Sequence, residues 1–190
     1  MADDNAISLR GPGGQALTLH RSHPRLLLIG EGAGIGPTLF VAERVREVAA
    51  SEAPRTTTPP HATSGMSQAS TPSLPAPALW HPLVLLGSMG LPFPFRPRPS
   101  VIVVPGIPTG VIACMPLLED WSVASRLAST LDLPGCFEGS VIALAESWLS
   151  TLTPQELAEV EIFPNGTALL VQEAARLAAH FAIRCQTPSV

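Results

Sequence analysis

The sequence predicts an α/β protein with a doubly wound, mostly parallel sheet of five or six strands and helices on both faces. Two observations lead to this prediction. In residues 25–47, a short apolar run, a glycine-rich turn and an amphipathic stretch follow one another as in a strand, turn and helix unit. Beyond this unit, further short apolar runs alternate with helical patterns, as expected where helices connect parallel strands.

The unit in residues 25–47, RLLLIGEGAGIGPTLFVAERVRE, has the composition of a phosphate-binding turn. Residues 26–29 form the expected buried strand, and Pro37 opens the expected helix, whose first position needs no backbone N–H. Glycine lets backbone N–H groups approach an anion closely, and the positive end of the helix adds its field. The predicted nucleotide-binding residues of this unit are Gly30, Gly32, Gly34, Ile35, Gly36, Pro37 and Thr38.

The spacing of the glycines leaves a second interpretation open. The pattern G-x-G-x-G-x-G-P differs from the G-x-G-x-x-G that marks dinucleotide-binding turns. A glycine-rich turn after a strand also occurs where a chain reverses tightly without holding a ligand. Both interpretations, a phosphate site and a purely structural turn, stand on the sequence alone.

The predicted domain is a single unit, residues 15–190, which follows a flexible lead in residues 1–14. The helix after the glycine turn is expected to reach about residue 50. Residues 51–79 are dominated by proline, serine, threonine and alanine, a composition that buries too little apolar area to offset its ordering entropy. We therefore predict a disordered insertion inside this one domain.

The later elements complete the predicted sheet. Further strands are expected at residues 16–19, 82–87, 100–104, 125–129 and 160–163 and at the C-terminal RCQ, and helices at residues 111–121, from 140, from 154 and at 167–181. Gly87 and Ser88 end one of these strands, and ligands collect at the carboxyl ends of parallel strands. They are therefore candidates for the ribose side of a nucleotide, although a plain turn fits them equally well.

The composition of the chain argues against nucleic acid as a partner and against a bound metal. The net charge is −4, and the 11 basic residues, all arginine, form no concentrated patch, which argues against nucleic acid as a partner. The densest basic spot is Arg96 with Arg98, either beside a ligand phosphate or in a solvated loop. The three cysteines include no C-x-x-C pair, so we expect buried, inert thiols and no metal site.

Neither a membrane span nor an exported protein is expected. The apolar stretches are broken by proline or glycine and fall short of the roughly 20 residues that a span needs. The N-terminal MADDNAISLRG is acidic where a signal peptide would be basic, so we expect cytoplasmic residence.

A family resemblance sharpens these expectations. The stretch LLLIGEGAGIGPTLFVAERV resembles the first strand, glycine turn and helix of the NAD(P)-binding domain of the ferredoxin reductase superfamily. Within that superfamily, RGPGGQALTLHRSHPRLLLIG is most similar to the lead segment of the electron transfer subunit of dihydroorotate dehydrogenase. The resemblance implies that Asn165, Gly166 and Thr167 occupy the turn that carries Cys-Gly-Pro in the family, next to the nicotinamide or flavin ring. An amide replaces the thiol here and cannot supply thiolate chemistry.

The resemblance implies an electron transfer or oxidoreductase subunit of pyrimidine biosynthesis that binds a pyridine or flavin nucleotide, with NAD(P) as the expected ligand. The FAD and 2Fe-2S sites of the family are missing, so a dehydrogenase or flavoprotein subunit is the expected partner, and activity of the chain alone is not expected. The alternative is a non-catalytic interaction or ligand-sensing module, favoured by the absent thiol and the proline-rich loops. An independent acid–base enzyme is the weakest option, because the adjacent acids Glu119 and Asp120 point apart on a helix.

Overall fold

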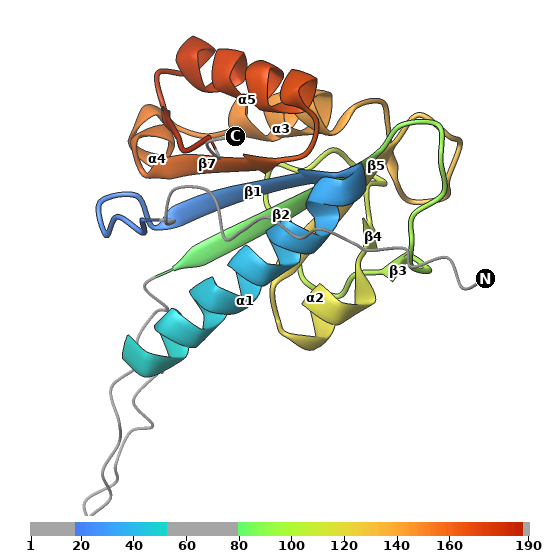
Figure 1. Cartoon of the computed structure of the whole chain (residues 1–190), viewed down its shortest axis with the longest axis horizontal. Coiled ribbons are helices and arrows are strands. Elements are labelled where there is room, and N and C mark those ends of the chain that lie inside the picture. The colour runs from blue at the N-terminus through green and yellow to red at the C-terminus, as the bar shows by residue number, and fades with distance from the viewer. Residues whose placement is uncertain (1–17, 53–79, 188–190) are drawn as a thin grey trace, which may run out of the picture.

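A six-stranded, all-parallel sheet with helices packed against it forms the centre of the protein (Figure 1). The computed structural model describes residues 18–52 and 80–187. The strands of this sheet are β1 (Arg25–Glu31), β2 (His81–Ser88), β5 (Ala124–Ser129), β6 (Phe137–Glu138), β7 (Val160–Asn165) and β8 (Arg184–Cys185). The helices are α1 (Ile35–Glu52), α2 (Pro116–Asp120), α3 (Val141–Leu149), α4 (Pro154–Ala158) and α5 (Ala168–His180). A short 3-10 turn, η1 (Gly32–Gly34), precedes α1, and β3 (Arg98–Pro99) pairs with β4 (Ala113–Cys114) in a separate antiparallel ribbon. The predicted α/β class is confirmed.

The winding of the sheet reverses beside β1. The strand order is β6-β5-β2-β1-β7-β8, so the chain moves outward from β1 through β2, β5 and β6 and then returns to the other side of β1. At the reversal, Gly30 at the end of β1 stands opposite Asn165 at the end of β7. Ligands of doubly wound sheets bind near such a reversal, outside the carboxyl ends of the strands.

Alternation along β1 divides the core into two layers. Leu26 and Leu28 pack in the layer that contains α1 and α2, whereas Leu27 and Ile29 pack in the layer that contains α3 and α5. Figure 1 shows α1 and α2 on one side of the sheet and α3 and α5 on the other. Because both faces of β1 are covered, the sequence of this strand is an unbroken apolar run instead of an alternating one.

Most of the predicted strands and helices are confirmed. The strands expected at residues 82–87, 125–129 and 160–163 are β2, β5 and β7. The helix expected from residue 154 is α4, and its start is fixed by a capping box between Thr153 and Glu156. The helices expected from residue 140 and at 167–181 are α3 and α5, each with a hydroxyl side chain as its N-cap.

The strand predicted at residues 100–104 is wrong. Its β-branched side chains fit a strand, but polar side chains of neighbouring elements take its backbone groups. The backbone N–H of Val101 donates to Glu119 Oε1 at 2.7 Å, and the carbonyl of Ile102 accepts from Arg126 at 2.6 Å. The segment is therefore held as an irregular loop that joins no sheet ladder.

The helix predicted at residues 111–121 is wrong in its first half. The backbone N–H groups of Ile112 and Ala113 both donate to the carbonyl of Gly135, at 2.9 Å and 2.7 Å, which holds this part extended as it enters β4. The helix α2 begins only at Pro116. Proline is thus its first residue, where a missing N–H is harmless, and it does not kink a longer helix.

The helix after the glycine turn is longer than predicted at both ends. It begins at Ile35, so Pro37 is its third residue, still among the first four whose N–H groups lack an intrahelical partner. It ends at Glu52, so the predicted insertion does not begin at residue 51. The rest of that insertion and the predicted N-terminal lead lie outside the described residues.

The strand predicted at residues 16–19 is described only in part, and its described residues, Thr18 and Leu19, belong to no strand. Although the predicted insertion separates β1 from β2, the two pair in register along their whole length, Arg25 with His81 through Glu31 with Gly87. Within residues 18–52 and 80–187, no helix is long and apolar enough to cross a membrane.

Candidate functional site

The turn after β1 and the turn after β7 are packed backbone against backbone. A Cβ placed on Gly34 would lie 1.9 Å from the carbonyl oxygen of Asn165 and 2.6 Å from the nitrogen of Gly166. A Cβ on Gly166 would lie 2.5 Å from Leu170 Cδ2 and 3.3 Å from the carbonyl oxygen of Glu31. Only glycine permits the first of these approaches, because backbone atoms cannot move aside as a side chain can. The two predicted turns therefore meet at the reversal point of the sheet.

Thr38 stabilises the glycine turn through its side chain. Its buried hydroxyl donates to the carbonyl of Gly34 at 2.8 Å and lies 3.4 Å from the carbonyl oxygen of Ile29. A Cβ on Gly30 would lie 2.6 Å from Thr38 Oγ1, so these two residues pack directly on each other. Gly30 and Thr38 therefore shape the turn, and neither lines the cavity beside it.

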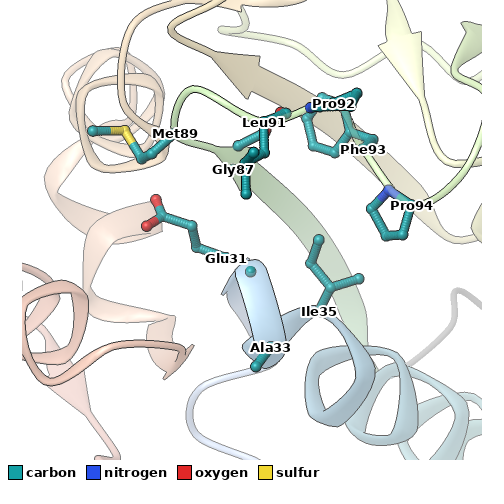
Figure 2. Close-up of a pocket in the computed structure, with 11 residues that line it drawn as sticks. Glu31, Ala33, Ile35, Gly87, Met89, Leu91, Pro92, Phe93 and Pro94 are labelled. Atoms are coloured by element: carbon teal, nitrogen blue, oxygen red, sulfur yellow. Dashed lines mark hydrogen bonds between the residues drawn. The ribbon is translucent and has the colours of Figure 1, made fainter.

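A cavity of about 450 Å³ opens between the carboxyl ends of β1 and β2 (Figure 2). Four of the predicted site residues line it: Gly32, Ile35, Gly87 and Ser88. The segment that follows β2 supplies a largely apolar wall, consisting of Met89, Leu91, Pro92, Phe93 and Pro94. In Figure 2, Ile35 and the glycine turn face this wall across the cavity. The structure thus brings the turn after β1 and the end of β2 together around one space.

Glu31 is a lining residue that was not among the predicted ones. It is the last residue of β1 and stands opposite Gly87 in register. Its Oε2 lies 3.0 Å from the position that a Cβ on Gly87 would occupy, so the carboxylate reaches over the end of β2. Burial, and next the nearby negative charge of Glu173, raise the pKa of Glu31 above its ordinary value of 4.5. The sequence carries a signal for this residue, an acid inside a glycine-rich turn.

The start of α1 leaves the backbone accessible. A Cβ placed on Gly32 or on Gly36 would meet nothing within 4 Å, and Gly32 has a left-handed φ of +56°. The first turn of α1 carries no acidic side chain, and the helix runs for 18 residues. Its amino end is therefore an open, partly positive position next to the cavity.

The remaining predicted residues lie outside the cavity. Pro37 is exposed on the first turn of α1. Asn165, Gly166 and Thr167 lie on the β7 side of the glycine turn, and none of them lines the cavity. Thr167 is the N-cap of α5, its hydroxyl accepting from the backbone N–H of Leu170 at 3.2 Å. These residues lie at the reversal point of the sheet, outside the cavity.

Neither the predicted basic spot, Arg96 with Arg98, nor the cysteines line the cavity. Arg98 is paired with Asp120, and Arg96 is exposed. All three cysteines are free, burial raises the pKa of each thiol, and the pKa of Cys185 reaches about 11. Cys114 is buried as predicted, whereas Cys136 and Cys185 are only half-buried, and the raised pKa values keep the thiols protonated near neutral pH. No group of three or more His, Cys, Asp or Glu side chains suited to a metal ion occurs in residues 18–52 and 80–187.

Comparison with protein-family models, with curated proteins and with solved structures finds no match for this chain. The resemblance to the ferredoxin reductase superfamily therefore rests on the motifs of the sequence.

Proposed function

We propose that the chain is the nucleotide-binding part of an oxidoreductase, an electron transfer subunit related to that of dihydroorotate dehydrogenase in pyrimidine biosynthesis. A pyridine or flavin nucleotide, with NAD(P) foremost, binds at the glycine turn. The observation that carries this proposal is the cavity between the ends of β1 and β2, which opens beside the amino end of α1. A helix amino end attracts phosphate, and a concave, largely apolar space suits a nucleoside.

Different residues around the turn would contact different parts of the nucleotide. Gly32 and Gly36 leave the backbone open to the pyrophosphate, since no side chain stands over either position. Ile35 and Gly87 border the nucleoside half in the cavity. The nicotinamide or flavin ring extends toward Asn165 on the other side of the turn. The bound nucleotide supplies the redox chemistry, and the protein supplies binding and orientation.

The proposal includes a partner subunit. The described residues offer no ligand set for a 2Fe-2S cluster, because they contain no suitable group of metal-binding side chains. A dehydrogenase or flavoprotein subunit would carry the cluster and the FAD, and the chain would not turn over substrate alone. We place this assembly in the cytoplasm, where pyridine nucleotides are available to it.

Calorimetric titration of the purified chain with NADH, NADPH and FAD tests the proposal. We expect one of the pyridine nucleotides to bind with a dissociation constant in the micromolar range. If none of the three binds at millimolar concentration, the glycine turn is purely structural and the proposal fails.

A second candidate function is a non-catalytic interaction module. The observation in its favour is the segment after β3, where Val101 and Val103 are 88% and 85% exposed. Exposed apolar side chains of this size are common in protein contacts. The same titration separates the two candidates, because a module of this kind binds no nucleotide. A purified protein that is yellow from retained flavin would contradict the module.

A further inference from the structure

The cavity beside the glycine turn has one ionisable side chain among its lining residues, Glu31, and no basic one. Glu173 of α5 lies close enough to Glu31 for its negative charge to raise the pKa of that carboxyl. The sequence contains no lysine. Beyond the apolar wall, Arg96 is exposed and does not line the cavity, and Arg98 of β3 is paired with Asp120. A phosphate group carried by a ribose next to Glu31 would therefore meet a carboxylate and no cationic side chain.

Glu31 is placed to bind a neutral group in the cavity. Its carboxylate reaches over Gly87 at the end of β2, and within the described residues it accepts no hydrogen bond from the protein. Ser88 is the other lining residue with a polar side chain, and its hydroxyl donates to the carbonyl of Leu91. Glu31 is thus the charged acceptor of the cavity with no hydrogen bond of its own among the described residues, and hydroxyl groups are its natural donors.

We propose that Glu31 determines the specificity of this site, selecting a dinucleotide whose ribose in the cavity carries free hydroxyl groups and rejecting one whose ribose carries a phosphate. The inference rests on the proposed function, because it assumes that a nucleotide binds at the glycine turn. Its physical basis is the sign of the charge at the end of β1. A carboxylate accepts hydrogen bonds from a diol and repels a phosphate, and partial burial of Glu31 limits the screening of that repulsion by water.

Calorimetric titrations of the wild-type chain with NADH and with NADPH test this inference, because the two ligands differ by one ribose phosphate. We expect NADH to bind more tightly by on the order of tenfold, the scale of one poorly screened like-charge contact. In Glu31→Gln, NADH binding weakens and NADPH binding strengthens, so that the ratio of the two dissociation constants falls toward one. In the control variant Glu146→Gln, which removes an exposed carboxylate from α3, the ratio stays at the wild-type value.

The outcomes separate this inference from the proposed function. If neither nucleotide binds, the proposed function fails and the inference fails with it. If both bind with equal affinity, or if Glu31→Gln leaves a wild-type preference unchanged, the nucleotide site stands and the role of Glu31 is wrong. Retention of NADH binding in Glu31→Gln shows that the variant is folded, so a changed ratio then reports specificity.

Discussion

Two neighbouring glycines differ in the space around them: Gly34 is tightly packed, and Gly36 is open. A Cβ on Gly34 would lie 1.9 Å from the carbonyl oxygen of Asn165, whereas a Cβ on Gly36 would meet nothing within 4 Å. We expect Gly34→Ala to lower the free energy of unfolding by on the order of 3 kcal/mol or more. The matched variant Gly36→Ala should leave it unchanged or raise it slightly, because alanine is the better helix former and Gly36 lies in the first turn of α1.

Urea unfolding followed by circular dichroism measures both changes. Equal stabilities for the two variants would contradict the close approach between the turns after β1 and β7.

Glu31 gives a pH dependence whose sign follows from its surroundings. Burial and Glu173 raise its pKa in the folded state above 4.5, so the folded chain holds this proton more tightly than the unfolded chain does. Ionisation of Glu31 therefore costs stability as the pH rises above 4.5, and the cost levels off above the folded-state pKa. We expect Glu31→Gln to match the wild type at about pH 4 and to become the more stable protein toward about pH 7. Urea unfolding across this range measures the difference, and a difference independent of pH would rule out the raised pKa.

At the scale of elements, the loop in residues 100–104 shows how side chains can overrule a strand pattern. Hydrogen bonds from the backbone of Val101 and the hydroxyl of Ser100 outweigh burial and hold the pKa of Glu119 below its usual range. We expect Glu119→Ala to speed hydrogen exchange of the Val101 amide by about tenfold or more, since a hydrogen bond to a charged group is lost. Asp120→Ala is the matched control, because its carboxylate pairs with Arg98 at the surface instead.

Amide exchange resolved by NMR measures this effect. Equal exchange rates in the two variants would mean that Glu119 does not hold the loop. The two adjacent acids have separate partners, Ser100 for Glu119 and Arg98 for Asp120.

The elements that could be predicted from the sequence are those whose patterns are local. The apolar run in β1, the hydroxyl N-caps of α3 and α5 and the capping box of α4 each depend on a few consecutive residues. The loop after β3 and the extended stretch that enters β4 could not be predicted, because Glu119, Arg126 and Gly135 contact them from later in the chain.

At the scale of the whole molecule, the site also combines features set by local sequence with features set by tertiary contacts. The glycine turn could be located from the sequence, but the roles of its glycines depend on tertiary packing. Gly34 is needed because Asn165 lies against it, whereas Gly32 lines the cavity and has open space around it. The contribution of Glu31 also emerges only when β1 pairs with β2 and the carboxylate is placed over Gly87. The α/β sheet can thus be predicted from the sequence, whereas the shape and charge of the cavity cannot.

The central claim is that a nucleotide binds with its phosphates at the start of α1 and its nucleoside in the cavity. Gly32 tests this claim directly, because it lines the cavity, has open space around it and has a left-handed φ that asparagine and aspartate tolerate better than other residues. Gly32→Asn and Gly32→Asp have nearly the same shape and differ by one negative charge.

The deciding measurement is calorimetric titration of these two variants with NADH. We predict that Gly32→Asn binds NADH within a few-fold of the wild type and that Gly32→Asp binds it weaker than Gly32→Asn by about tenfold or more, because the added carboxylate repels the phosphates. Equal affinities in the two variants would place the phosphates away from this turn and contradict the account.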